Sequence, residues 1–107
     1  MTLSQFLNEL TSREDRVPFI PNMDREHPPT FPEGTIVPVT EEVYWYYLEL
    51  LPPRWMRSSD FVFVDGAGKI LYFWELGRGT EKNYFGLQLS EEESQTFYEL
   101  ARIRQHV

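Results

Sequence analysis

Apolar residues recur at helical spacing near the start of the chain, and this pattern predicts a short helix over residues 3–11. Thr2 and Gln5 form a capping box in front of it, in which each side chain satisfies a backbone N–H of the other residue. The expected buried face consists of Leu3, Phe6, Leu7 and Leu10.

A second helical pattern runs from Thr40, the expected cap, to about Leu51 and ends before Pro52. It carries aromatic residues on more than one face. The stripe that we expect to meet the core is Val43, Tyr44, Tyr47, Leu48 and Leu51.

The outer side of this second helix is unusual for a purely solvated surface, because two carboxylates bracket two aromatic rings. Such rings bind a partner if they stay exposed, and belong to the core if another segment covers them. Both interpretations remain open. The four residues recur at i, i+3, i+4 and i+7 and are Glu42, Trp45, Tyr46 and Glu49.

The segment between the two helices, residues 17–39, holds six of the eight prolines. Proline fixes its own torsion, lacks an N–H and biases the preceding residue toward extended forms. We therefore expect an irregular arm, not a helix or a central strand. Its apolar residues indicate that it packs on the body of the protein, and they are Val17, Phe19, Ile20, Met23, Phe31, Ile36 and Val37.

Three β-type runs follow, at residues 61–64, 70–74 and 84–89. An Asp-Gly turn at 65–68 and a glycine-rich turn at 77–80 separate them. The second run is apolar on both faces, so we place it in the centre of an antiparallel meander.

A second capping box starts the last helix, which we expect to bury Phe97, Leu100, Ala101 and the stem of Arg104. Ser90 and Glu93 form this box. The predicted fold is one α+β domain over residues 1–107, with a three-stranded antiparallel meander, about three helices and the proline-rich arm.

The composition narrows the class of protein. A hydrophobic fraction of 41% and an aromatic fraction of 16% favour a folded chain. No apolar run approaches the roughly 20 residues of a bilayer span, and the N-terminus lacks the pattern of a signal peptide. Since cysteine is absent, we expect a cytoplasmic protein without disulfides or thiolate metal sites.

Ten basic residues against 17 acidic ones give a formal charge of −7. This charge disfavours direct binding to nucleic acid, so we expect a protein partner with a basic surface, and no membrane contact. Part of the charge has a local explanation, because carboxylates stabilise the positive end of a helix. Mimicry of nucleic-acid charge is the alternative. A second candidate binding cluster at such a helix start is Glu91, Glu92 and Glu93.

The reactive residues show no catalytic or cofactor-binding pattern. His27 and His106 fit no metal-ligand spacing. Ser58 and Ser59 lie outside any nucleophile-elbow sequence. Glu75 would need burial and a second carboxylate at a suitable spacing to work as an acid or base. We therefore expect no enzyme activity, no cofactor and no metal site.

The segment after the second helix contains residue types that are enriched at the energetic centres of protein interfaces. Pro52 and Pro53 stiffen the chain, and Arg54 and Trp55 follow them. Trp55 either contacts a partner or tucks into the core while Arg54 stays solvated. The sequence leaves both open.

Several stretches resemble a family of short, uncharacterised bacterial proteins that are common on plasmids and other mobile elements. The matching stretches are Thr40-Glu41-Glu42, Tyr44 and Leu51-Pro52-Pro53, and the resemblance extends through Phe73-Trp74-Glu75 to Tyr84-Phe85. The family implies no activity and no site residue. It implies a gene that is carried on a mobile element. Small acidic proteins of such elements often act on host defence or on nucleic-acid machinery.

The leading hypothesis is therefore a non-enzymatic protein-binding protein, in particular an inhibitor that docks on a nucleic-acid-handling complex such as a CRISPR effector and blocks its basic channel. A small structural or adaptor homodimer, which would use an uncovered face of the sheet, is the alternative. An enzyme with an unrecognised carboxylate site is the third hypothesis.

Overall fold

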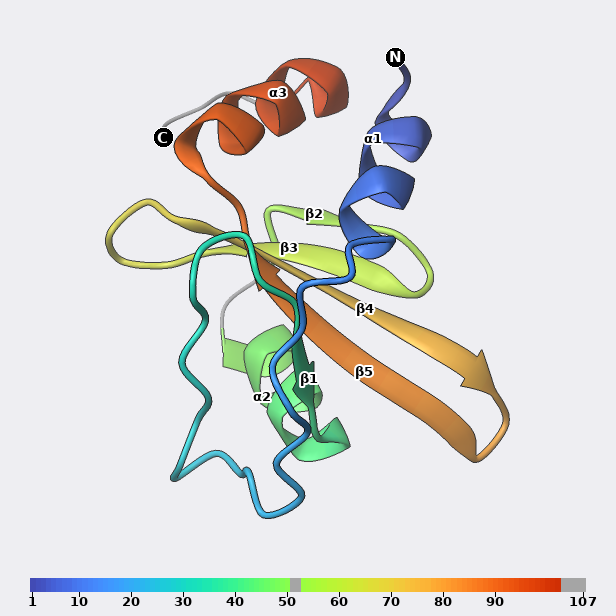
Figure 1. The fold of residues 1–107 in the computed structure, drawn as a ribbon. Helices are drawn as coiled ribbons and strands as arrows, with labels where there is room; N and C mark the ends of the chain where they lie inside the picture. The colour runs from blue at the N-terminus through green and yellow to red at the C-terminus, as the bar shows by residue number, and fades with distance from the viewer. Residues whose placement is uncertain (51–52, 103–107) are drawn as a thin grey trace.

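The computed structural model describes residues 1–50 and 53–102 and confirms an α+β fold, with three helices and an antiparallel sheet in this part of the chain. The sheet lies between two layers, with α1 and α3 on one face and α2 on the other (Figure 1). In chain order the elements are α1 (Leu3–Thr11), β1 (Val37–Val39), α2 (Glu41–Leu50), β2 (Trp55–Met56), β3 (Asp60–Val64), β4 (Ile70–Arg78), β5 (Glu81–Gln88) and α3 (Glu91–Ala101).

The prediction of three strands was wrong, because the sheet has five, in the order β1-β5-β4-β3-β2. The predicted meander is β3, β4 and β5, and the two additional strands lie at its edges. Both are very short, and β1 contains Pro38, so neither has the alternating run that identifies a strand in a sequence. An edge position suits Pro38, since proline has no N–H to donate to a second neighbour.

The predicted irregular arm over residues 17–39 also differs from the structure. Its last three residues form β1, which pairs with β5 from Val37↔Gly86 to Val39↔Tyr84. The remaining connection between α1 and β1, residues 12–36, makes two isolated bridges, Arg16↔Ile36 and Glu33↔Gln88. Backbone pairing within the segment, at Arg16 and Ile36, and with β5, at Glu33 and Gln88, thus satisfies backbone groups of this connection.

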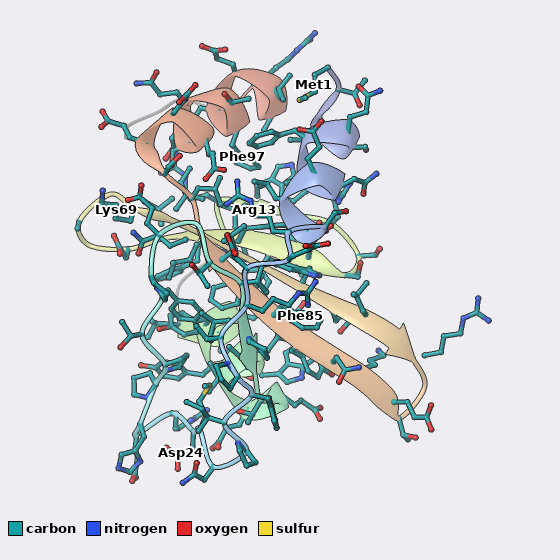
Figure 2. All side chains as sticks on the ribbon, viewed as in Figure 1. Met1, Arg13, Asp24, Lys69, Phe85 and Phe97 are labelled. Carbon is teal, nitrogen blue, oxygen red and sulfur yellow. The ribbon has the colours of Figure 1, made fainter. Side chains whose placement is uncertain are left out.

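The first layer packs α1 and α3 against one face of the sheet. Both predicted capping boxes are confirmed, Thr2 with Gln5 and Ser90 with Glu93. Figure 2 shows Phe97 in the space between α3 and the sheet. The fully enclosed members of this layer include Leu7, Leu10, Ile36, Ile70, Leu87, Leu89 and Phe97.

The second layer packs α2 and the 12–36 segment against the other face. Thr40 starts α2 as predicted, because its Oγ1 accepts a hydrogen bond from the Val43 N–H, and the same hydroxyl donates to the Met23 carbonyl. The predicted end of α2 at Leu51 and the predicted burial of Arg104 lie outside the described residues. Aromatic and β-branched residues dominate this layer, among them Val43, Tyr44, Phe61, Phe63, Phe73 and Tyr84.

The 12–36 segment packs on the sheet at Gly86. Phe31 packs edge-on against Phe73 with ring centroids 5.5 Å apart, directly over the position where Gly86 lacks a side chain. A Cβ at Gly86 would lie 2.6 Å from a Phe31 ring carbon and 2.8 Å from a Phe73 ring carbon. Glycine is therefore required by the close approach of two rings.

We predict that Gly86→Ala lowers the free energy of unfolding by about 1–3 kcal/mol, since both rings must move to admit the methyl group. The measurement is urea denaturation followed by circular dichroism. Gly66→Ala is the matched control, because an added Cβ there meets no atom within 4 Å. Equal denaturation midpoints for the two variants would contradict the seating of Phe31 on Gly86.

Candidate functional site

The sequence left open whether the outer face of α2, defined as Glu42, Trp45, Tyr46 and Glu49, is exposed or covered, and the structure exposes three of these four residues. Trp45 is 43% exposed, and both carboxylates are exposed. Tyr46 is half-buried, and the Arg25 guanidinium lies 5.6 Å from its ring centroid. One ring of the predicted pair is therefore open to a partner, and the other is partly covered by the 12–36 segment.

The indole of Trp45 contacts a buried neighbour on α2, Tyr44. Tyr44 meets Trp45 edge-on at 5.7 Å and packs on Phe61 and Tyr84. Its hydroxyl donates a hydrogen bond to the Ser59 carbonyl at 3.3 Å. Because these contacts fix the helix on the sheet, Trp45 is presented by a rigid element, and less entropy is lost when a partner binds it.

Arg54 and Trp55 do not join this surface. Trp55 is half-buried on the opposite side of the sheet, where it packs edge-on against Phe97 of α3 at 5.7 Å. The Arg57 guanidinium lies 5.1 Å from the centroid of the Trp55 ring. Arg54 is half-buried, and its backbone N–H donates a hydrogen bond to the Val62 carbonyl. The structure therefore separates Trp55 from Trp45, and it favours the core interpretation of Trp55.

The carboxylates at the start of α3 divide into two kinds. Glu93 closes the capping box with Ser90 and pairs with Arg13, which also donates to the Gly34 carbonyl. Arg13 lies between the two upper helices and the sheet (Figure 2). Glu91 and Glu92 are exposed in the first turn. Glu93 is thus used to hold the fold together, and only two members of the predicted cluster remain available on the surface.

The other candidate catalytic and metal-binding residues do not come together in one site. His27 contacts Asp24 on the exposed outer part of the 12–36 segment, where hydrogen bonds from His27 lower the pKa of the Asp24 carboxyl below its usual value. Glu75 is half-buried and pairs with Lys82 at 3.4 Å. His106 lies outside the described residues. Across residues 1–50 and 53–102, no three acidic or histidine side chains gather where they would hold a metal ion.

Asp60 is a buried carboxylate that the sequence analysis did not single out. It is 4% exposed and accepts hydrogen bonds from the Tyr72 hydroxyl at 2.6 Å and from the Arg57 guanidinium at 2.6–3.2 Å. Two donor groups thus compensate the buried charge. The cluster joins the turn between β2 and β3 to the central strand β4, so its role is structural.

A shallow pocket of about 290 Å³ lies beside the first turn of α2. It occupies the corner where β1 ends and α2 begins, and Phe19 borders it with 55% of its surface exposed. The sequence contained one signal for this feature, since Phe19 and Ile20 stand between Pro18 and Pro21. Its lining is Phe19, Pro38, Val39, Thr40, Glu41, Lys82, Asn83, Tyr84 and Phe85.

The helices of the described part of the chain are all too short or too polar to cross a bilayer. Comparison of the chain with protein-family models, with curated proteins and with solved structures found no match.

Buried tyrosines give the fold a predictable response to alkali. Burial raises the pKa of the Tyr44 and Tyr72 phenols above the usual value near 10, and the hydrogen bond to Asp60 raises that of Tyr72 further. Burial also raises the pKa of Tyr47 and Tyr84. Below about pH 10 the phenols are neutral in both the folded and the unfolded chain, so their contribution to stability is complete.

We predict that the free energy of unfolding falls once the pH exceeds about 10, at a rate that approaches about 1.4 kcal/mol per pH unit for each of Tyr44 and Tyr72. The reason is that the unfolded chain then loses phenol protons that the folded protein keeps. Urea denaturation midpoints between about pH 8 and pH 11 measure the effect, and Tyr44→Phe should make the decline less steep. A midpoint that stays level up to pH 11 would refute this linkage.

Proposed function

We propose that this chain is a non-enzymatic protein-binding protein whose contact surface is the outer face of α2. The observation that carries the proposal is the exposed Trp45, which stands on a rigid helix between two carboxylates. Tryptophan is among the residues that contribute most to binding energy at protein interfaces. An exposed indole on a well-packed helix, in contact with the buried Tyr44, loses less freedom on binding than one on a loop.

The partner that suits this surface carries basic residues around an apolar depression. Glu42 and Glu49 flank Trp45 on α2, and the chain as a whole has a formal charge of −7. Such a charge speeds the encounter with a basic protein. The Trp45 indole, once it is buried in the complex, slows dissociation. The rate of association should therefore depend on salt, and the rate of dissociation on Trp45.

A narrower form of the proposal is inhibition of a nucleic-acid-handling complex, such as a CRISPR effector, by occupation of its basic channel. Its support is the negative charge together with the resemblance to proteins of mobile elements. The homodimer alternative loses the feature that favoured it, because the protein's own helices lie on both faces of the sheet (Figure 1).

We predict that Trp45→Ala abolishes capture of the partner and lowers the unfolding free energy by only about 0.5–1.5 kcal/mol, the contribution of its edge-on contact with Tyr44. The measurement is quantitative pull-down from the cells that contain the protein, with the bound proteins identified by mass spectrometry. Trp55→Ala is the matched control, because Trp55 packs on Phe97. It should lower stability by about 3 kcal/mol or less, given its half-buried position, yet retain the same partner at a temperature where it is folded.

Charge is tested separately by Glu42→Gln with Glu49→Gln. This double variant should reduce the association rate and flatten its dependence on salt. Capture that is the same for Trp45→Ala and the parent would rule out the outer face of α2. Light scattering would favour the homodimer if it gave a stable dimer that Trp45→Ala dissociates.

A further inference from the structure

Strand β5 is longer than its neighbour at the outer edge of the sheet. Its pairing with β4 continues without a break to Arg78↔Glu81, near the turn. Its pairing with β1 stops at Val39↔Tyr84, because the chain turns at Thr40 into α2. In the described part of the chain, residues 81–83 therefore have a strand on one side only. This end of the β4–β5 ribbon extends away from the helices (Figure 1).

The backbone of Lys82 directs its hydrogen-bonding groups toward this open edge. In an antiparallel ladder, successive residues point their N–H and C=O to alternate sides. The Leu89 N–H donates to Ile70 on the β4 side, whereas the Gln88 carbonyl accepts from Gly34 on the outer side. Because the register is unbroken, the backbone N–H and C=O groups of the even-numbered residues of β5 point toward the outer edge. Lys82 is thus the next position after Gly86 and Tyr84, which are paired with β1.

The pocket beside α2 lies at the same edge. Lys82 and Asn83 line it together with the end of β1, the first turn of α2 and the exposed Phe19. An extended segment that continued the line of β1 along β5 would therefore find both unpaired backbone groups and a depression for a side chain. These are the two features by which sheets recognise added strands.

The charges at this edge specify the occupant. Lys82 pairs with Glu75. Glu41 is the acidic residue in the pocket wall, and no described cation comes within ion-pair distance of it. Its charge reaches the neighbouring strand, since after burial it is the next cause that raises the pKa of Tyr84. A complementary side chain here is lysine or arginine.

The geometry points to β-strand addition: an extended basic segment of a partner protein pairs antiparallel with β5 at Lys82, in line with β1. The segment's residue opposite Lys82 donates its N–H to β5 and turns a basic side chain toward Glu41. The residues next to it turn apolar side chains toward Phe85. This contact goes beyond the proposed function, because it uses backbone groups and Glu41 and does not require Trp45.

The test uses a fluorescein-labelled, end-capped octapeptide of alternating valine and lysine, and measures binding to the full chain by fluorescence anisotropy. Methylation of the lysine backbone nitrogens removes the N–H groups that face β5, whereas methylation of the valine nitrogens removes only those that face solvent. We expect the first peptide to bind about tenfold more weakly than the second, although their charges are identical.

Two protein variants complete the experiment. Lys82→Pro removes the outward N–H at a position where an edge strand tolerates proline, and should weaken binding about tenfold, whereas Lys82→Ala keeps the N–H and should stay within about threefold. Glu41→Lys should remove the preference for this peptide over one of alternating valine and glutamate. If Lys82→Pro does not fold, the methylated peptides still decide the question on the unaltered protein.

Equal affinity for the two methylated peptides would overturn strand addition and would indicate attraction by charge alone. Failure of the unmodified peptide to bind saturably at millimolar concentration would overturn the assignment of a basic occupant. Trp45→Ala belongs in the same assay and should leave peptide binding unchanged. The proposed function and the strand contact can therefore fail independently.

Discussion

The fold depends on the burial of aromatic rings on both faces of β4. On one face, Tyr72 and Trp74 stack at 5.0 Å, and Trp74 continues the stack to Phe85 at 5.6 Å. On the other face, Phe73 stacks on Phe61 at 5.1 Å and on Tyr47 at 4.9 Å. Offset stacking of this kind contributes beyond the burial of apolar area. The arrangement also has a cost, because the described residues give the buried Trp74 Nε1–H no acceptor, and an unpaired buried donor costs about 1–3 kcal/mol.

This two-sided burial explains why the sheet has short, protected edges. A single layer of helices would leave half of the rings exposed, and the chain covers one face with α1 and α3 and the other with α2. At one edge, β2 is only two residues long and is held by the cluster of Asp60, Arg57 and Tyr72. At the other, β1 contains Pro38. A short edge strand and an edge proline both limit uncontrolled pairing with other sheets. In the part of the chain that the structure describes, residues 81–83 of β5 lack such protection on their outer side.

The elements with strong local signals could be predicted from the sequence. Both capping boxes, the three helices and the meander strands follow from capping chemistry and periodicity. The edge strands could not be predicted in this way, since β1 and β2 exist through pairing with distant residues and not through their own pattern. The Asp60 cluster was missed for the same reason, because Tyr72 lies 12 positions away in sequence.

The candidate surface was predicted in part. Periodicity on α2 correctly separated Trp45 from the core stripe, because the helix is regular and amphipathic there. Trp55 carried no comparable signal. Its strand is too short for alternation to show which face it joins, and only the packing on Phe97 settles its position. The three tryptophans thus occupy three different environments, although they belong to one residue type.

The joining of α1 to α3 has a consequence for the order in which the molecule is built. These helices stand at opposite ends of the described chain, yet they share one hydrophobic cluster and the Arg13–Glu93 ion pair. On the ribosome, α1 emerges before every strand that it covers, and α3 emerges after those strands. Contacts between residues so distant in sequence slow the closing of the structure. The hydrophobic cluster that contains the apolar face of α1 is therefore complete only after Phe97 of α3 has been added.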